Sequence, residues 1–388
     1  MAAVPQVVPQ QEYVDRVAKA RKLMREQKVD GLIVTDPVSI YYFAGMKIPT
    51  WQKGRPSALV LPLDGEPVLV TWSGPEMFAR LYHRPFPSWV QDKRIYPEAP
   101  MTHEEPVDWG IIGALKDRRL GDARLAIEMG DGCRLAMPLN DFLLLQKTFP
   151  KATFVDSSPI IWGCRVIKSK WEQACSRNAC EIGGRAWKRA IAELKPGIAA
   201  REIQRRILQY YLEEGADLDS EPPTALGATG QGGTFQKGDI LYLDGGCSFM
   251  GYRMDFTRRC VFGPPSERQQ AEHDGMWDIL FKVMDRMKPG VSMAEIFEYS
   301  QSLLAKTNWT NYSNHPAKRI GHGIGLENEP PSLSPFDHRL LEPGMIITPE
   351  PKIETVEGLL NPEEHIVITA SGYEIYSKHP DWPLHVVQ

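Results

Sequence analysis

Two aspartates, Asp244 and Asp255, stand eleven residues apart in the segment GDILYLDGGCSFMGYRMDFTRRCVFG, residues 238–263. Asp244 ends an apolar strand pattern, and the glycine-rich stretch after it is typical of a hairpin that leads into a second strand carrying Asp255. A hairpin can place both carboxylates on one face, where they repel each other unless a cation or a shared proton lies between them. The alternative is that Asp244 is a turn residue and that Asp255 pairs with Arg258 or Arg259.

Three further segments carry candidate ligands for such a cation. His322 lies among glycines in GHGIGLENEPPSL, where little crowding surrounds the imidazole, although a single histidine is more often structural. Glu350 follows an apolar strand in GMIITPEPKI, between two prolines, and a carboxylate in this setting is costly unless it is paired or metal-bound. Glu363 and Glu364 precede the strand pattern HIVIT, a position where an acidic pair is usually solvated.

The order of these residues resembles the creatinase, prolidase and methionine-aminopeptidase family, which has the pita-bread fold. The order is Asp, a second Asp eleven residues later, HGxG, GMxxTxEP, and a Glu six residues before the Thr of a closing strand. The resemblance runs from about Arg165 to the C-terminus and includes RVIKSKWEQA at the expected domain junction. Upstream, GLIVTDPVSIYYFAGM resembles the N-terminal domain of the creatinase–prolidase branch. The resemblance implies an N-terminal creatinase-like α/β domain and a C-terminal pita-bread domain built from two duplicated halves.

The same resemblance implies five metal ligands and two divalent ions. Asp244 would chelate one ion, and Asp255 and Glu363 would bridge both. His322 and Glu350 would bind the second ion. Four carboxylates and one imidazole favour Mn, Co, Fe or Zn. Two ions about 3.5–4 Å apart can activate a water molecule and polarise a substrate oxygen.

The loop after His322 departs from the peptidase pattern. Peptidases of this family usually continue as HGIGLxxHExP, whereas this chain reads HGIGLENEPP, one residue shorter, with Asn328 and Glu329 in that region. The segment TALGATGQGGTFQKGD also lacks the histidine that peptidases tend to carry before the first aspartate strand. Because these histidines help to hold or protonate the tetrahedral intermediate, we expect a poor Xaa-Pro peptidase. The alternative is that Glu329 points to solvent and that His315 or His338 supplies the missing function.

Glu350, Asn328 and Glu329 are the candidate catalytic side chains. A Glu329 carboxylate beside four others would suit a cationic substrate group, or would be a base whose pKa its neighbours raise. The first hypothesis is therefore a dinuclear-metal hydrolase of a small amide or another C–N bond.

Two other functions are compatible with the sequence. One is a metal-dependent lyase of a small zwitterion, because dimethylsulfoniopropionate lyases of this family have a similarly shortened loop. Those lyases carry Asp-x-Asp where this chain reads LDGG. The other is a catalytically silent binding protein of the same fold, although such proteins usually lose metal ligands and this chain has all five expected residue types.

The segment PTWQKGRP, residues 49–56, is expected to form an exposed loop of the N-terminal domain. The face of Trp51 can bind a quaternary or sulfonium cation, and Arg55 can form two hydrogen bonds with a carboxylate. In the creatinase branch this domain often reaches the active site of the partner subunit. Trp51 and Arg55 are therefore candidate substrate-binding residues, unless Trp51 packs on its own domain.

The elements that must position these residues follow from hydrophobic periodicity. EYVDRVAKARKLMREQKVDG predicts a helix that stops near Gly31. Its apolar positions share one helical face: Tyr13, Val17, Ala20 and Met24. GLIVTDP, RLAIEMG and ATFVDSS predict strands, and SALVLPLDGEPVLVTW predicts two strands around an Asp-Gly turn. This alternation indicates a small α/β domain over residues 1–160.

Residues 161–388 are expected to form the catalytic domain. LKPGIAAREIQRRI begins at Leu194, and the similar MKPGVSMAEIFEYS begins at Met287, 93 residues later. Each Lys-Pro-Gly lies between two amphipathic helices, which indicates a duplicated half-domain, although Pro-Gly after a helix is also a common stop. A site between two related halves would take ligands from both.

Composition excludes several other classes. A length of 388 residues favours two domains, and a net charge of −4 argues against a nucleic-acid-binding surface. The chain has no run of 18 apolar residues and no signal-peptide pattern at its N-terminus. Its six cysteines show no CxxC spacing and are expected to be reduced. We therefore expect a cytoplasmic homodimer that acts on a small molecule, without nucleic-acid or membrane partners.

Overall fold

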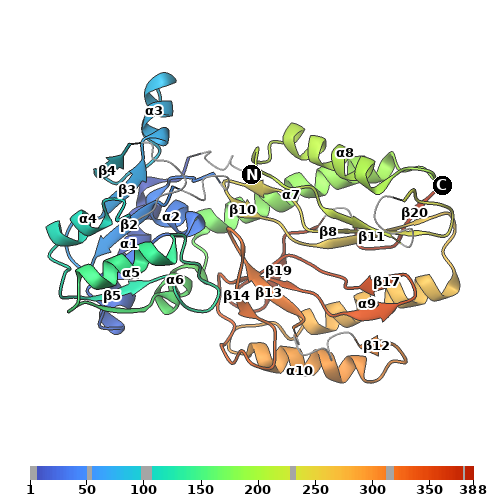
Figure 1. Ribbon diagram of the computed structural model, residues 1–388. Helices are drawn as coiled ribbons and strands as arrows, with labels where there is room; N and C mark the ends of the chain where they lie inside the picture. The colour runs from blue at the N-terminus through green and yellow to red at the C-terminus, as the bar shows by residue number, and fades with distance from the viewer. Residues whose placement is uncertain (1–6, 50–54, 98–106, 228–232, 312–318, 379–380) are drawn as a thin grey trace. The chain divides into compact units, whose positions relative to one another are not determined.

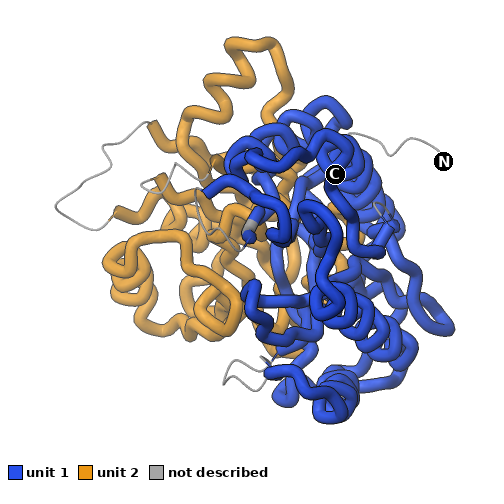
Figure 2. Tube along the Cα trace, turned by 90° about the vertical axis from the view of Figure 1, so that its right-hand side faces the viewer, with its two compact units in different colours: residues 1–6, 166–388 blue, residues 7–165 orange. Residues whose placement is uncertain are grey.

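The chain forms two compact units, residues 7–165 and residues 166–388 (Figure 2). The residues that the computed structural model describes are 7–49, 55–97, 107–227, 233–311, 319–378 and 381–388. The boundary between the units lies a few residues beyond position 160, where the composition changes. Among the described residues, no helix has the length and apolar character needed to cross a membrane.

The N-terminal unit is a mixed sheet with helices. Its helices are α1 (Gln10–Glu26), α2 (Pro37–Ala44), α3 (Gly74–Leu81), α4 (Ile111–Asp117), α5 (Leu139–Thr148) and α6 (Ser158–Arg165). Its strands are β1 (Gly31–Val34), β2 (Ala58–Pro62), β3 (Val68–Trp72), β4 (Asp92–Tyr96), β5 (Arg124–Ile127) and β6 (Thr153–Asp156). The strand order is β4-β3-β2-β1-β5-β6. The β1–β5, β5–β6 and β3–β4 pairs are parallel, and the β1–β2 and β2–β3 pairs are antiparallel.

Most of the predicted N-terminal elements are present. Helix α1 buries the predicted apolar face, and β2 and β3 form the predicted hairpin, with Gly65 in a left-handed conformation (φ 101°). The predicted end of the first helix near Gly31 is wrong, because α1 ends at Glu26 and Gly31 begins β1. Lys28 has φ 56°, a conformation that cannot continue a right-handed helix.

The C-terminal unit contains two helix pairs and two main sheets. Its helices are α7 (Lys170–Ala192), α8 (Ala200–Glu213), α9 (Glu267–Met284) and α10 (Met293–Leu304). One sheet, in the order β20-β11-β8-β7, consists of His385–Val387, Thr257–Phe262, Ile240–Asp244 and Thr224–Leu226. The other, in the order β14-β13-β15-β18-β19, consists of Asn328–Ser332, Gly321–Ile324, Ile346–Pro349, Ile366–Ile368 and Tyr373–Ile375. The smaller strands are β9 (Ser248–Phe249), β10 (Tyr252–Arg253), β12 (Thr310–Asn311), β16 (Ile353–Thr355) and β17 (Gly358–Leu360).

The predicted duplication is visible in this unit. The strands lie between the α7–α8 pair and the α9–α10 pair (Figure 1). The two Lys-Pro-Gly turns have matching geometry, since Gly197 has φ 89° and Gly290 has φ 86°. An isolated bridge follows each turn, Ala199 with Thr234 and Ser292 with Leu340. The repeated helix–turn–helix–strand order is therefore structural and not a coincidence of helix stops.

The two halves supply different candidate ligands. Asp244 ends β8, and Asp255 lies just before β11, in the first half. The second half carries His322 in β13, Glu350 directly after β15, and Glu363 shortly before β18. Apolar side chains of β15 and β18 belong to the same buried core as those of α9 and α10, which fixes these strands. The five residues are thus held by strand ends on a packed scaffold.

Candidate metal centre

The pairing of β8 with β11 brings the two aspartates together. The strands are antiparallel, and Thr257 is the register partner of Asp244, so Asp255 lies next to that pair. Burial, together with repulsion from Asp244 and Glu350, raises the pKa of Asp255 well above its usual range. Burial also raises the pKa of Asp244. The pair therefore favours either a shared proton or a cation, as the hairpin pattern predicted.

His322 presents one ring nitrogen toward Asp255. Its Nδ1 lies 3.0 Å from the carbonyl of Gly323, to which it can donate, and its Nε2 lies 3.6 Å from Asp255 Oδ2. This arrangement fixes the tautomer that leaves Nε2 available as a ligand. Burial lowers the pKa of His322, so that the imidazole is neutral at pH 7, which is the form that binds a metal.

The glycines around His322 allow close backbone approach. Strand β13 lies between β14 and β15. A Cβ atom at Gly323 would overlap the carbonyl oxygen of Pro330, and one at Gly321 would lie 2.5 Å from the carbonyl oxygen of Thr348. The two glycines thus place the imidazole in a tightly packed strand that larger residues could not form.

Glu363 is the acid of the Glu-Glu pair that faces this group. It is 1% exposed, and its Oε1 has no hydrogen-bond partner among the described residues. Burial and the charges of Asp255 and Glu350 raise its pKa well above the usual range. Glu364 is engaged elsewhere, because it accepts a hydrogen bond from Arg258 Nη2 at 3.1 Å.

Asp255, His322 and Glu363, here called the inner trio, form the candidate metal site. One ligand atom from each lies within 4.8 Å of the others. The buried Glu363 carboxylate, which has an unpartnered oxygen, and the partly buried Asp255 carboxylate are unfavourable side by side without a cation. Oxygen and imidazole nitrogen donors suit a divalent transition metal. The residues therefore fit the metal that the sequence predicts, while the number of ions stays a prediction.

Asp244 and Glu350, here called the outer pair, lie outside that group and contact other protein donors. Glu350 Oε2 lies 2.8 Å from Lys352 Nζ and accepts a hydrogen bond from Asn361 Nδ2 at 3.2 Å. Its Oε1 lies 3.5 Å from Arg319 Nη2.

The other outer acid is held by a neutral donor. The Tyr242 hydroxyl lies 2.9 Å from Asp244 Oδ2 and 2.6 Å from Asn361 Oδ1. Because Asn361 also binds Glu350, a chain of neutral groups links the two outer acids.

Sequence reasoning missed four groups around the carboxylates: Tyr242, Lys352, Asn361 and His365. The spacing signal was present for all four. Lys352 and His365 each stand two residues after a predicted ligand, and residues two apart in an extended segment share one face. Tyr242 likewise precedes Asp244 by two residues in β8. Asn361 in turn precedes Glu363 by two residues.

The sequence left two alternatives for Glu329, a place beside the other carboxylates or an orientation toward solvent, and the structure shows neither. Asn328 is exposed at the start of β14. Glu329 is buried and forms an ion pair with Lys168, whose side chain is 2% exposed. Glu329 therefore neither points to solvent nor adds an uncompensated charge. Lys168 belongs to the KS dipeptide of the domain junction, far away in sequence.

Four residues that the sequence singled out lie elsewhere or outside the described part of the chain. Trp51 and His315 fall outside the described residues. Arg55 lies over the ring of Trp72, with its guanidinium carbon 4.7 Å from the ring centre. His338 is exposed. The roles of Trp51 and Arg55 in substrate binding stay predictions.

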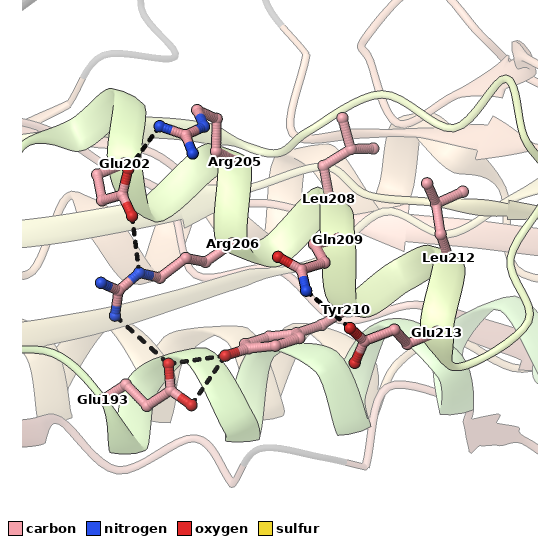
Figure 3. A pocket seen from close by; sticks show the side chains of 9 residues that line it. All are labelled: Glu193, Glu202, Arg205, Arg206, Leu208, Gln209, Tyr210, Leu212 and Glu213. Carbon is pink, nitrogen blue, oxygen red and sulfur yellow. Dashed lines mark hydrogen bonds and ion pairs between the residues drawn. The ribbon is translucent and has the colours of Figure 1, made fainter.

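A surface hollow along α8 is distinct from the candidate metal site (Figure 3). It is lined by Glu193, Glu202, Arg205, Arg206, Leu208, Gln209, Tyr210, Leu212 and Glu213. Its polar groups bind one another: Arg206 Nε donates to Glu202 at 3.0 Å, and the Tyr210 hydroxyl donates to Glu193 at 2.7 Å. None of the candidate ligands lines it, so we place the candidate site at the inner trio.

Known families match both units. Residues 174–370 match the model of metallopeptidase family M24, and residues 16–167 match the creatinase/prolidase N-terminal domain. An Xaa-Pro dipeptidase of Pyrococcus horikoshii is 25% identical over 376 residues, 94% of this chain and 97% of that protein. An uncharacterized peptidase of Bacillus subtilis is 25% identical over 381 residues, 94% of this chain and 98% of that protein.

Solved structures share the fold. A prolidase from Thermococcus sibiricus has a TM-score of 0.82 and 22% identity, and the match covers 98% of this chain and all of that one. An Xaa-Pro dipeptidase from Bacillus anthracis has a TM-score of 0.79 and 20% identity, and the match covers 97% of this chain and all of that one. At these identities the likeness shows the architecture alone.

Proposed function

The chain belongs to metallopeptidase family M24, and we propose that it hydrolyses a C–N bond in a small, carboxylate-bearing substrate and cleaves Xaa-Pro dipeptides poorly. Family membership makes it a metal-dependent hydrolase. The proposal concerns the substrate and the residues that select it.

The proposal rests on the positions of two side chains in the segment that connects β13 to β14 and begins β14. The side chain of Glu329 is buried in an ion pair with Lys168, and Asn328 is exposed. Neither contributes an imidazole to the site. Loss of one donor to a developing oxyanion typically costs about 10²–10³ in rate. Peptide substrates that depend on such a donor should therefore react slowly.

The remaining side chains have separate tasks in this proposal. Asp255, His322 and Glu363 would hold the metal, which polarises a carbonyl and lowers the pKa of water when bound. The Glu350 carboxylate is positioned to accept a proton during the reaction, because Lys352 and Asn361 hold its Oε2 in place.

Arg319 is the group that favours a carboxylate-bearing substrate. Its side chain is 42% exposed and its Nη2 lies 3.5 Å from Glu350 Oε1, so part of the guanidinium is free to meet solvent or substrate. A guanidinium can bind a carboxylate through two parallel hydrogen bonds. The relative from Pyrococcus horikoshii is an Xaa-Pro dipeptidase, which makes Xaa-Pro dipeptides the natural reference substrates.

Steady-state kinetics test the proposal. The protein loaded with Mn or Co is assayed on Xaa-Pro dipeptides and on small N-acyl, guanidino and betaine-like compounds. We expect turnover of a small carboxylate-bearing compound and little turnover of the dipeptides. Arg319→Met should raise KM for that compound more than it lowers kcat. A kcat/KM above about 10⁴ M⁻¹s⁻¹ on Xaa-Pro dipeptides would mean that the loop argument is wrong.

Isotope labelling separates hydrolysis from elimination. In H₂¹⁸O, hydrolysis of an amide places one ¹⁸O atom in the acid product, whereas β-elimination places none. The same assay on Asp255→Asn is the control for background reaction. Product without the label would support a lyase and overturn the proposed hydrolysis.

A further inference from the structure

Arg258 is a buried cation close to the candidate metal site. It stands in β11, three residues after Asp255, and its side chain is 1% exposed. Its Nη2 lies 3.1 Å from Glu364 Oε1, and the side chain of Glu364 is 4% exposed. This arginine thus pairs with the acid that directly follows the candidate ligand Glu363 in the chain.

The guanidinium of Arg258 joins several segments of the C-terminal unit. Nη1 donates to the carbonyl oxygen of Thr257 at 2.7 Å, within β11. Nη2 donates to the carbonyl oxygen of Ser377 at 2.7 Å, and Ser377 Oγ in turn donates to Glu364. The guanidinium carbon lies 5.3 Å from a ring centre of Trp277 in α9. A planar group with several fixed donors can hold such partners in one geometry, which a single ammonium cannot do.

The start of β11 also holds the backbone around Glu363. The Thr257 N–H donates to the carbonyl oxygen of Glu363 at 3.3 Å, and Thr257 Oγ1 donates to that of Asn361 at 2.9 Å. Strand β11 belongs to the first half of the unit, whereas Asn361 and Glu363 belong to the second. Because Asp255 precedes Thr257 by two residues, these contacts lie where ligands from the two halves meet.

Stability alone does not account for the pair of Arg258 with Glu364. Removing two charges from water costs about as much as their attraction returns, so apolar residues of similar volume often stabilise a fold equally well. The pair does fix which of two neighbouring acids is free. Glu364 is held by Arg258, while Glu363 offers an oxygen within 4.8 Å of ligand atoms of Asp255 and His322.

We infer that Arg258 and Glu364 are positioning residues for the metal centre, because their ion pair joins the two halves of the domain and sets the separation of the Asp255 and Glu363 carboxylates. The inference rests on the metal dependence of the family and is independent of the substrate class proposed above. Without the pair, the two carboxylates stand on halves whose contact is looser, so the metal binds more weakly and in a changed geometry.

Metal affinity tests this inference without an activity assay. The double variant Arg258→Met with Glu364→Leu removes both charges, so that neither is left buried alone, and circular dichroism checks its fold. Affinity for Co is measured by competition with a chelator, and the geometry of the bound ion by its visible absorption. We expect the affinity to fall by about 10–100-fold, the usual cost of losing groups that orient ligands, and the absorption spectrum to change.

Arg177→Met with Glu374→Leu is the matched control. Arg177 donates to both carboxylate oxygens of Glu374, at 2.6 and 2.7 Å, and this pair also joins the two halves, from α7 to β19. The control should match the wild type in affinity and spectrum. Wild-type values in the Arg258 and Glu364 double variant would overturn the inference. An equal loss in the control would overturn it as well, because the effect would then be a general loosening of the domain.

A single variant keeps the test decisive if the double variant fails to fold. Arg258→Lys retains a charge beside Glu364, but an ammonium cannot also bind the carbonyl oxygens of Thr257 and Ser377 in the same geometry. We expect its affinity for Co to lie more than about threefold below that of the wild type, with Arg177→Lys unchanged. An affinity of Arg258→Lys equal to that of the wild type would mean that the guanidinium does not position the ligands.

Discussion

The imidazole of His365 holds the backbone of Asp255. The Asp255 N–H donates to His365 Nδ1 at 3.2 Å, and His365 Nε2 lies 2.8 Å from Ser176 Oγ. Burial lowers the pKa of His365 to about 3, so the ring is neutral at pH 7. Because Nδ1 is the acceptor, Nε2 carries the proton and donates to Ser176. A serine of α7 therefore orients the ring that positions a predicted metal ligand.

We expect Ser176→Ala to weaken metal binding by about 10–100-fold, the usual cost of losing a group that orients a ligand. Competition with a fluorescent chelator measures the affinity. Ser371→Ala, at an exposed position, is the control and should match the wild type. An affinity for Ser176→Ala within twofold of the wild type would show that the ring needs no such support.

Asp255→Ala should lose most of the bound metal, because Asp255 belongs to the inner trio and the substitution removes one of its three ligand side chains. Metal content after gel filtration measures the loss. Asp278→Ala is the matched control, since Asp278 is exposed and pairs with Lys282 on the surface of α9. If Asp255→Ala keeps the metal content and activity of the wild type, the site has been wrongly placed.

Local sequence signals indicated that the two aspartates could meet and that the domain has two halves, whereas the set of five ligands came from the family resemblance. The register of β8 and β11 explains why two aspartates eleven residues apart meet, and the repeated Lys-Pro-Gly turns indicated the two halves. The choice of Glu363 over Glu364 rested on spacing. The structure adds a physical reason, because Glu364 is already paired with buried Arg258.

Contacts between distant segments could not be predicted in the same way. The sequence shows no link between Lys168, at the domain junction, and Glu329, in the shortened loop, so the charge of Glu329 looked uncompensated. The end of α1 was misplaced because a single left-handed residue, Lys28, has no strong sequence marker. The spacing of Lys352 from Glu350 was informative, but a lysine is not a metal ligand and so lies outside the ligand pattern.

Glu128 should make stability depend on pH. It is 1% exposed, and its Oε2 accepts hydrogen bonds from the N–H groups of Thr35 and Asp36 at 2.6 and 2.7 Å. Burial outweighs these bonds and raises its pKa from 4.5 to about 7. Between these values the folded state binds more protons than the unfolded state, so the free energy of unfolding falls as the pH rises.

The resulting prediction compares Glu128→Gln with the wild type. From pH 4 to pH 8, the variant should become more stable relative to the wild type by about 3 kcal/mol, because it has no proton to lose in this range. Urea unfolding at several pH values measures the difference. Glu26→Gln, at an exposed position of α1, should show no such trend. A constant difference across the range would mean that the Glu128 pKa is not raised.

The ion pair of Lys168 with Glu329 should be essential for stability and not for proton transfer. Both side chains are almost fully buried, with 2% and 1% exposure. Glu329→Gln leaves the Lys168 ammonium in the interior without its counter-charge, a change that typically costs about 3–5 kcal/mol. We therefore expect a large fall in the free energy of unfolding, while kcat of the protein that remains folded changes little.

A double variant distinguishes this role from catalysis. Lys168→Met with Glu329→Leu removes both charges and should recover most of the lost stability, because replacing a buried ion pair by apolar residues is often neutral. Lys282→Met with Asp278→Leu, at an exposed pair, should change stability by less than about 1 kcal/mol. If the buried double variant is stable and binds metal but has lost activity, Glu329 takes part in the reaction and its pairing with Lys168 must open when substrate binds. If activity returns together with stability, the shortened loop serves to close the fold around the metal ligands, and the substrate preference comes from the missing histidine alone.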